Sequence, residues 1–84
     1  MKKITGKQLR MARASLKYRV DDISKKTGVP WARIQFYERN DEELEPNDKL
    51  NDIIKFFESE KIIFEDGNQD FLPFIKIKKN TIKI

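Results

Sequence analysis

The stretch VDDISKKTGVPWARIQFYE, Val20–Glu38, decides the fold that this 84-residue chain can adopt. It predicts two short helices around a tight corner, the first over 21–27 and the second over 30–39. Gly28 stands at the corner, where a residue without a Cβ can take a left-handed backbone conformation. Pro30 suits the start of the second helix, because the amide hydrogen that proline lacks is not used in a first turn.

This stretch also has the residue pattern of a helix-turn-helix. Such a motif needs a small residue in its first helix, a glycine at the corner with an apolar residue after it, and two apolar core positions in its second helix. The residues that meet these needs are Ser24, Gly28, Val29, Ile34 and Tyr37. Many all-helical domains share the pattern, so the rest of the chain has to distinguish between them.

Another helix is expected before this stretch, over about 6–16. Thr5 and Gln8 form a capping-box pattern, in which each side chain bonds to the other residue's backbone amide. The helix is followed by a bend, where we expect Tyr18 to pack into the core. The apolar residues that we expect to face inward in this helix are Leu9, Ala12, Ala14 and Leu16.

The chain after the stretch predicts a fourth helix. Residues 40–46 form a polar, acidic loop, and Asn47 or Asp48 then caps a helix that runs to about Ser59. Its apolar stripe consists of Leu50, Ile53, Ile54 and Phe57.

The apolar pattern changes its period after residue 60. Residues 61–65 and 74–78 have the short, β-rich character of strands, and Asp66-Gly67-Asn68 is a turn signal between them. Residues 81–84 alternate too and form either a third strand or a tail. We expect a mainly α fold, a four-helix helix-turn-helix domain over 1–60, with a small C-terminal β-hairpin over 61–84 as part of the same domain.

Composition excludes several classes of function. The chain has no cysteine and no histidine, so it lacks the commonest general base and the commonest metal ligands. Its carboxylates do not have the spacing of a metal site. We therefore expect no enzyme activity, no cofactor, no metal and no small-molecule substrate. No apolar run approaches the ~20 residues of a membrane span, and a cytoplasmic protein without a membrane partner is expected.

Charge is distributed unevenly along the chain. Residues 1–40 contain eleven Lys/Arg and three Asp/Glu, a net charge of +8. Residues 41–72 contain three Lys/Arg and eleven Asp/Glu, a net charge of −8, and residues 73–84 add four lysines. The basic block coincides with the helix-turn-helix candidate, as attraction to nucleic-acid phosphates requires.

The chain resembles the short Cro/CI-type (Xre-like) bacterial transcriptional regulators. The segments that carry the resemblance are GKQLRMARASL, ISKKTGVP, ARIQFYE, LNDIIKFFES and KIIFEDG. Together they cover nearly all of residues 5–67. The resemblance implies a lambda-repressor-like fold, sequence-specific binding of double-stranded DNA, and a recognition helix over 30–39 that enters the major groove.

Site residues follow from the resemblance by position. It implies base contacts from Trp31, Ala32, Arg33, Gln35 and Phe36. It implies phosphate contacts from Arg19 and Asn40, and an ion pair between Arg13 and Glu38. We interpret that ion pair as a contact that holds the fold. Because operators for such domains come as paired half-sites, a homodimer is also expected, through the strand over 74–78 or the apolar face of the fourth helix.

The sequence departs from the family at several positions. Arg19-Val20 replaces the usual Ser or Thr followed by Gln, and Phe36 stands where a polar residue is common. Arg39-Asn40 displaces a glycine after the recognition helix. Lys61 replaces another glycine after the fourth helix, so a residue with a Cβ is expected to take the left-handed conformation there. The carboxylates of residues 41–45 would oppose phosphates unless the loop points away.

An alternative function is suggested by the aromatic residues of the second helix. Trp31 and Phe36 fall on a different side of the helix from Ile34 and Tyr37, so we expect both aromatic side chains to be exposed. An exposed Trp with a nearby Phe is also typical of protein-binding hot spots. The alternative is therefore a helix-turn-helix scaffold used as a protein–protein interaction module, antitoxin-like or anti-repressor in type.

Overall fold

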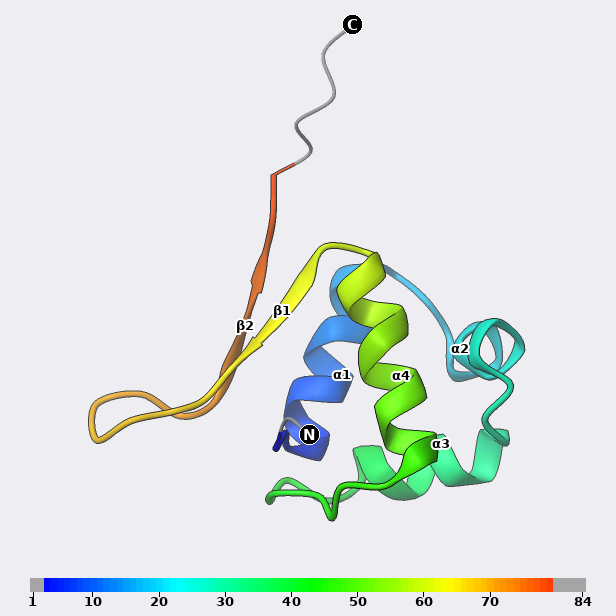
Figure 1. Ribbon diagram of the computed structural model, residues 1–84, viewed down its shortest axis with the longest axis horizontal. Helices are drawn as coiled ribbons and strands as arrows, with labels where there is room; N and C mark the ends of the chain where they lie inside the picture. Colours follow the sequence, from blue (N-terminus) through cyan, green and yellow to red (C-terminus); the bar gives the residue numbers. More distant parts are fainter. Residues whose placement is uncertain (1–2, 80–84) are drawn as a thin grey trace, which may run out of the picture.

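The computed structural model describes residues 3–79, which form four helices and a two-stranded antiparallel sheet (Figure 1). The helices are α1 (Gly6–Ser15), α2 (Val20–Thr27), α3 (Trp31–Glu38) and α4 (Asp48–Ser59). The strands are β1 (Ile62–Glu65) and β2 (Phe74–Ile77). The prediction of a mainly helical chain with four helices and a C-terminal hairpin is confirmed. The strand or tail expected over 81–84 lies outside the described residues.

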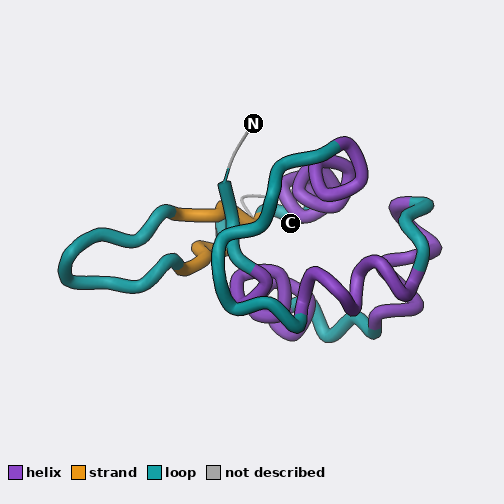
Figure 2. The backbone as a smooth tube through the Cα atoms, turned by 90° about the horizontal axis from the view of Figure 1, so that it is seen from below, coloured by secondary structure: helices purple, strands orange, loops and turns teal. Residues whose placement is uncertain are grey.

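The elements form a compact helical body from which the hairpin projects (Figures 1 and 2). α2 packs against both α3 and α4, and α1 also contacts α3. β1 lies against α4 and β2 against α1, while the eight-residue connection 66–73 extends away from the body. Within residues 3–79, no helix has both the length and the apolar character needed to cross a membrane.

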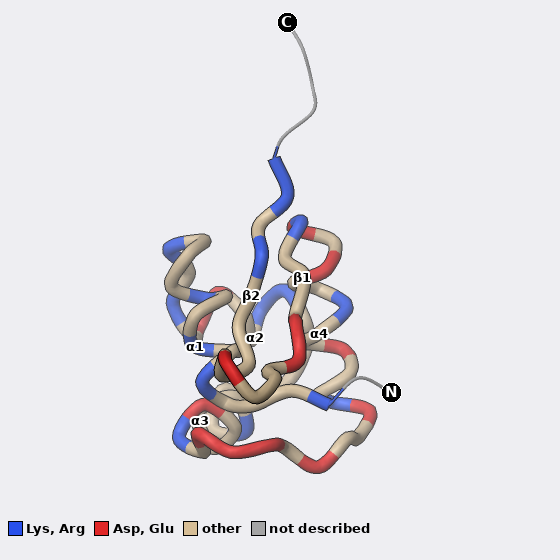
Figure 3. Tube along the Cα trace, turned by 90° about the vertical axis from the view of Figure 1, so that its left-hand side faces the viewer, with Lys and Arg blue, Asp and Glu red and all other residues tan. Residues whose placement is uncertain are grey.

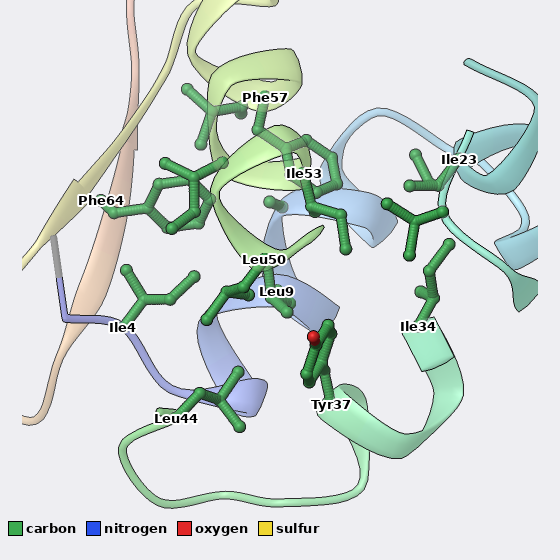
Figure 4. Packing of buried hydrophobic residues seen from close by; sticks show 14 residues of the cluster. Ile4, Leu9, Ile23, Ile34, Tyr37, Leu44, Leu50, Ile53, Phe57 and Phe64 are labelled. Carbon is green, nitrogen blue, oxygen red and sulfur yellow. The ribbon is translucent and has the colours of Figure 1, made fainter. Parts of the chain in front are cut away.

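One cluster of buried apolar side chains joins the helices to the hairpin (Figure 4). Ile23 of α2 and Ile34 of α3 meet Ile53 of α4 in this cluster. The rings of Phe57 in α4 and Phe64 in β1 meet edge to face, with their centroids 6.1 Å apart. The hairpin base therefore shares the core of the helices.

Two buried residues of this core were not predicted from the sequence. Ile4 precedes α1, and Leu44 lies in the acidic loop between α3 and α4, yet they are only 1% and 4% exposed. The Ile4 carbonyl accepts a hydrogen bond of 2.8 Å from the Leu44 amide. Thr5 and Glu43 form an isolated antiparallel bridge beside it. This long-range pairing fixes the path of the loop after α3.

The side-chain caps predicted for α1 and α4 are confirmed. The Thr5 hydroxyl accepts from the Gln8 amide at 3.1 Å, and the Gln8 side-chain oxygen accepts from the Thr5 amide at 2.8 Å. Asn47, not Asp48, caps α4, since its side-chain oxygen accepts from the Leu50 amide at 2.9 Å. The Tyr37 hydroxyl donates to the same Asn47 oxygen at 3.0 Å, which ties the cap of α4 to α3.

Gln8 has a second role that the capping pattern does not predict. Its side-chain amide is 1% exposed and donates to the carbonyls of Glu65 and Phe74, at 2.8 and 2.9 Å. These two residues are paired across the end of the hairpin nearest its turn. One buried amide therefore caps α1 and fastens both strands to it, with every hydrogen-bonding group of that amide satisfied.

Three described residues have left-handed backbone conformations. Gly28 has φ 79° and Lys61 has φ 72°, as expected for the corner and for the end of α4. Lys17, with φ 59°, was not foreseen. The left-handed region costs a residue with a Cβ about 1–2 kcal/mol, so the surrounding packing has to stabilise both lysines.

One expectation about an inward-facing side chain is wrong. Ala14 is exposed, because it lies about 200° around the helix from the buried Ala12. α3 further begins one residue later than predicted, with Pro30 as its N-cap.

Candidate nucleic-acid interface

The connection between α2 and α3 is fixed by short hydrogen bonds. The Ser24 hydroxyl donates to the Val29 carbonyl at 2.7 Å, and the Thr27 hydroxyl accepts from the Val29 amide at 3.2 Å. Gly28 between them ends α2, and its amide donates to the Ser24 carbonyl at 2.8 Å. Val29 is 2% exposed and fills the corner. The orientation of α3 relative to α2 is therefore set by side chains of α2 as well as by the core.

α3 has one face in the core and one face in solvent. Ile34, Tyr37 and Glu38 are buried. Trp31 and Phe36 are 48% and 61% exposed, which confirms the prediction that these two aromatic side chains lie outside the core. Since the helix turns about 100° per residue, Phe36 lies on the side opposite Ile34 and Glu38. Trp31 lies in the same row as Glu38 and is exposed in the first turn of the helix.

The exposed side of α3 brings most of the residues predicted to contact bases together. At helical spacing, residues 31, 35 and 39 form one row and residues 32 and 36 form the next. We call the surface made by Trp31, Ala32, Gln35, Phe36 and Arg39 the outer face. Gln35 is half-buried, and the other four residues are exposed. The outer face consists of apolar side chains around one amide, with a cation at its C-terminal end.

Two arginines of α3 and its C-cap differ from the predicted set of base contacts: Arg33 lies less centrally than predicted, and Arg39 was not in the set. Arg33 was expected among the base contacts, but it lies at the edge of the outer face, one position before the buried Ile34. Arg39, exposed at the C-cap of α3, was not singled out from the sequence. Its spacing of four residues from Gln35 is the signal that identifies it.

A bidentate ion pair holds the inner side of α3 against α1. Arg13 donates from Nε and Nη2 to the two carboxylate oxygens of Glu38, each at 2.8 Å. It also donates to the Tyr18 carbonyl at 3.1 Å. The hydrogen bond to Glu38 raises the pKa of Arg13 above its ordinary value. The Glu38 side chain is only 9% exposed and that of Arg13 is 25% exposed, so this partly buried pair holds α3 against α1.

The C-terminal end of α3 is held by α1 in two further ways. Arg10 donates to the Glu38 carbonyl and places a cation at the negative end of the helix dipole. Gly6 allows the backbones to meet, since a Cβ there would lie 2.0 Å from the Asn40 carbonyl oxygen and 2.1 Å from that of Tyr37. The outer face is therefore presented by a helix that is fixed at both ends.

The residues predicted to contact phosphates lie at two ends of the site. Arg19 is exposed at the N-terminus of α2, and its backbone amide donates to the Asp22 carboxylate at 2.8 Å. Asn40 is exposed just after α3, and its side-chain oxygen accepts from the Glu42 amide at 3.0 Å. A shallow depression connects the start of α2 to the outer face. It is lined by Arg10, Arg13, Val20, Gln35, Glu38 and Arg39.

The acidic loop runs beside the C-terminal end of α3 (Figures 1 and 3). Asp41 is paired with Arg10 at 2.6 Å, and Leu44 is buried against the N-terminal segment. Glu42, Glu43 and Glu45 remain exposed. The loop therefore turns under α1, away from the end of α3 where Trp31 lies.

Among residues 3–79, no three acidic side chains come together in a way that would hold a metal ion. Comparisons give no further guidance, because no protein-family model, curated protein or solved structure matches the chain. The candidate site rests on the residues of the outer face and on how they are held.

Proposed function

We propose that this chain binds double-stranded DNA in a sequence-specific way, as a small transcriptional regulator. In this proposal α2 and α3 are a helix-turn-helix, and α3 enters the major groove. The observation that carries it is the outer face, a solvent-exposed surface on a helix whose other side and both ends are fixed. A rigid helix with a free face is what readout in the ~12 Å wide major groove requires.

The charge distribution supports the same partner. The net charge of residues 1–40 is +8, and the outer face contains no carboxylate. Arg19 and Arg33 are exposed beside it and Arg39 is exposed within it. Lys and Arg contacts to phosphates supply affinity without sequence information and fix the position of a protein on the duplex.

Roles for individual residues follow from their chemistry. Gln35 can pair with adenine through its amide, and Arg33 or Arg39 can form two hydrogen bonds to guanine or one to a phosphate. Arg19 and Asn40 are the proposed phosphate contacts at the two ends of the site. Arg13 and Glu38 do not contact DNA in this proposal, because they hold α3 in place.

A homodimer is part of the proposal, in which the hairpin of one copy of this chain contacts the hairpin of a second copy. Phe71 and Leu72 at the hairpin connection are 65% and 73% exposed, and Ile77 of β2 is 56% exposed. The hairpin is also polarised in charge (Figure 3). Acidic residues Asp66 and Asp70 lie at its turn, and lysines lie toward its other end.

Antiparallel pairing of two such hairpins is favoured by both features. It places the acidic turn of one copy near the lysines at the far end of the other, including Lys78 and Lys79. It also gives β2 a partner along an edge and covers the exposed apolar side chains. A two-fold dimer of this kind would read two half-sites about 34–36 Å apart.

A second candidate function is favoured by the same two aromatic side chains. Trp31 and Phe36 are large and exposed on one short helix, which is also typical of a protein-binding hot spot. In that case α3 would contact another protein. Binding through buried aromatic contacts would respond little to salt, whereas binding to phosphates weakens steeply as salt increases.

Selection of duplexes from a random DNA library by the purified chain tests the proposed function. The proposal predicts enrichment of a two-fold symmetric motif, whose affinity falls linearly with salt on a logarithmic scale. Matched selection with a Gln35→Ala variant should lose the preference at one position of each half-site. Failure of the wild-type chain to enrich any motif would contradict the proposal.

A further inference from the structure

The centre of the outer face is neutral and largely apolar. Trp31 and Phe36 expose about half or more of their surface, and Ala32 is exposed between them. Gln35 is the polar residue among these four side chains, while the arginines lie at the edge and the end of the face. Apolar side chains gain nothing from DNA phosphates. The apolar side chains of the outer face therefore require apolar groups in the major groove as their contacts.

We propose that the outer face selects A·T base pairs, with Phe36 and Trp31 packed on thymine methyl groups. This inference rests on the proposed DNA-binding function and names the base pairs that it reads. The C5-methyl of thymine is the apolar group that a major groove displays, and adenine beside it offers the acceptor and donor that an amide can bind. Gln35 with its aromatic neighbours matches both halves of an A·T pair.

G·C pairs fit the centre of this surface less well. Guanine presents two acceptors, which are best met by a cation, and cytosine presents a donor, which is best met by a carboxylate. The four central side chains supply neither of these groups. Arg33 and Arg39 can meet guanine or phosphate only at the boundary of the face, so A·T selection is confined to the central base steps.

The two aromatic side chains are available for this contact because the core does not use them. Phe36 contacts the Tyr37 ring edge to face, with centroids 6.2 Å apart, and remains 61% exposed. Trp31 opens the helix, beyond Pro30, and is 48% exposed. Their replacement should therefore change binding without unfolding the chain, since substitutions at exposed positions usually alter stability little.

Replacing thymine with uracil tests the inference directly. The probe is a duplex enriched from the random library, prepared once with thymine and once with uracil at every thymine position. The two duplexes offer the same hydrogen-bonding groups and differ in the methyl groups alone. Each contacted methyl should contribute about fourfold in affinity, from ~0.8 kcal/mol per buried CH₂. The wild-type chain should bind the uracil duplex at least about fourfold more weakly.

Phe36→Ala and Trp31→Ala are the informative variants. Each should bind the thymine duplex more weakly and show a reduced ratio between the two duplexes, and the double variant should bind both duplexes equally. Lys55→Ala is the control, because Lys55 is exposed on α4, outside both the outer face and the hairpin. It should keep the wild-type ratio.

The outcomes separate this inference from the function on which it rests. Equal binding of both duplexes by the wild-type chain would overturn the inference and leave DNA binding intact. A wild-type ratio that persists in the double variant would overturn the assignment to Phe36 and Trp31. Binding to neither duplex would overturn the proposed function and the inference together, and a salt-insensitive protein complex that needs both aromatics would identify the other partner.

Discussion

The two faces of α3 differ in how completely their side chains are partnered. On the inner face, Ile34 is buried in the core, Tyr37 donates to the cap of α4, and Glu38 accepts two hydrogen bonds from Arg13. On the outer face, Trp31 and Phe36 are largely in solvent. One short helix therefore keeps the side chains that stabilise the fold on one face and presents the proposed binding residues on the other.

The inner face matters to the outer one because α3 is short. A helix of eight residues is not stable alone in water, where about 12–15 residues are needed even for good helix formers. Its conformation depends on the core, on the corner at Gly28 and on the contacts from α1. Substitutions on the inner face should therefore abolish both folding and binding, and those on the outer face should affect binding alone.

The largest effect is expected for Glu38→Ala. This change leaves Arg13 without its carboxylate partner at a site where the Glu38 side chain is 9% exposed. Removal of one member of a buried pair costs about 3 kcal/mol or more. The free energy of unfolding, measured by urea denaturation, should fall by that amount. Asp41→Ala is the matched control, since it breaks the more exposed pair with Arg10 and should cost less than ~1 kcal/mol. Equal losses in both variants would contradict the distinction.

A smaller loss is expected for Gly6→Ala. The new Cβ would overlap the backbone oxygens of Asn40 and Tyr37, at 2.0 and 2.1 Å, so α1 and the end of α3 would have to separate. Overpacking of this type costs about 1–3 kcal/mol. Thermal denaturation should show a lower midpoint, whereas Lys7→Ala, on the next and exposed residue, should stay near the wild-type value. An unchanged midpoint for Gly6→Ala would show that the contact is looser than the structure places it.

The outer face should show the opposite separation of effects. Gln35→Ala and Arg39→Ala should leave the free energy of unfolding within about 0.5 kcal/mol of wild type. Each should weaken binding to an enriched duplex by about 1–3 kcal/mol. Fluorescence anisotropy of labelled duplex measures the second quantity. If these variants lost stability as well as binding, the claim that the outer face affects binding alone would be contradicted.

The smallest effect is expected at Tyr18, which follows α1. Its hydroxyl donates to the Glu60 carboxylate at 3.0 Å, and this hydrogen bond raises the pKa of Tyr18 above its ordinary value. A raised pKa means that this contribution to stability is full at neutral pH and is lost as the pH rises through the tyrosine pKa. Glu60→Gln should lower the pKa of Tyr18 in an NMR titration of the ring carbons. A pKa that does not move would remove Glu60 as the cause.

Local patterns predict most of the elements of this fold. The capping pair Thr5 and Gln8, the corner at Gly28 and the apolar stripe of α4 each act over a few residues, and the structure contains all three. The left-handed conformation of Lys61 was also foreseen, because the resemblance places a glycine there. Propensity, capping and periodicity are readable from sequence because they depend on near neighbours.

Several contacts between distant segments were not predicted, although the resemblance implied the ion pair between Arg13 and Glu38 that the structure contains. Leu44 stands in an acidic loop and Ile4 in a basic N-terminal segment, so neither has a periodic apolar neighbourhood that marks it as core. The hydrogen bonds from Gln8 to the hairpin and the close approach at Gly6 likewise join segments that are far apart in the chain. Such contacts appear only when the elements are assembled.

The candidate site was predictable in its helix but not in its boundary. Helical spacing was enough to place Trp31 and Phe36 in solvent and Ile34 and Tyr37 inside. Arg39 was not predicted as a site residue, because the sequence pattern marked it only as the replacement of a glycine after α3. Its spacing of four residues from Gln35 places it on the outer face. The proposed DNA partner of the outer face rests on the chemistry of its side chains.

Trp31 provides the most direct test of the central claim that the outer face binds duplex DNA. It is the sole tryptophan of the chain, so its fluorescence reports on this face alone. On titration with an enriched duplex at low salt, we expect a change in Trp31 emission that saturates together with binding and is reversed by added salt. Saturable binding of the duplex with no change in Trp31 emission would place the DNA elsewhere on the molecule and contradict the account.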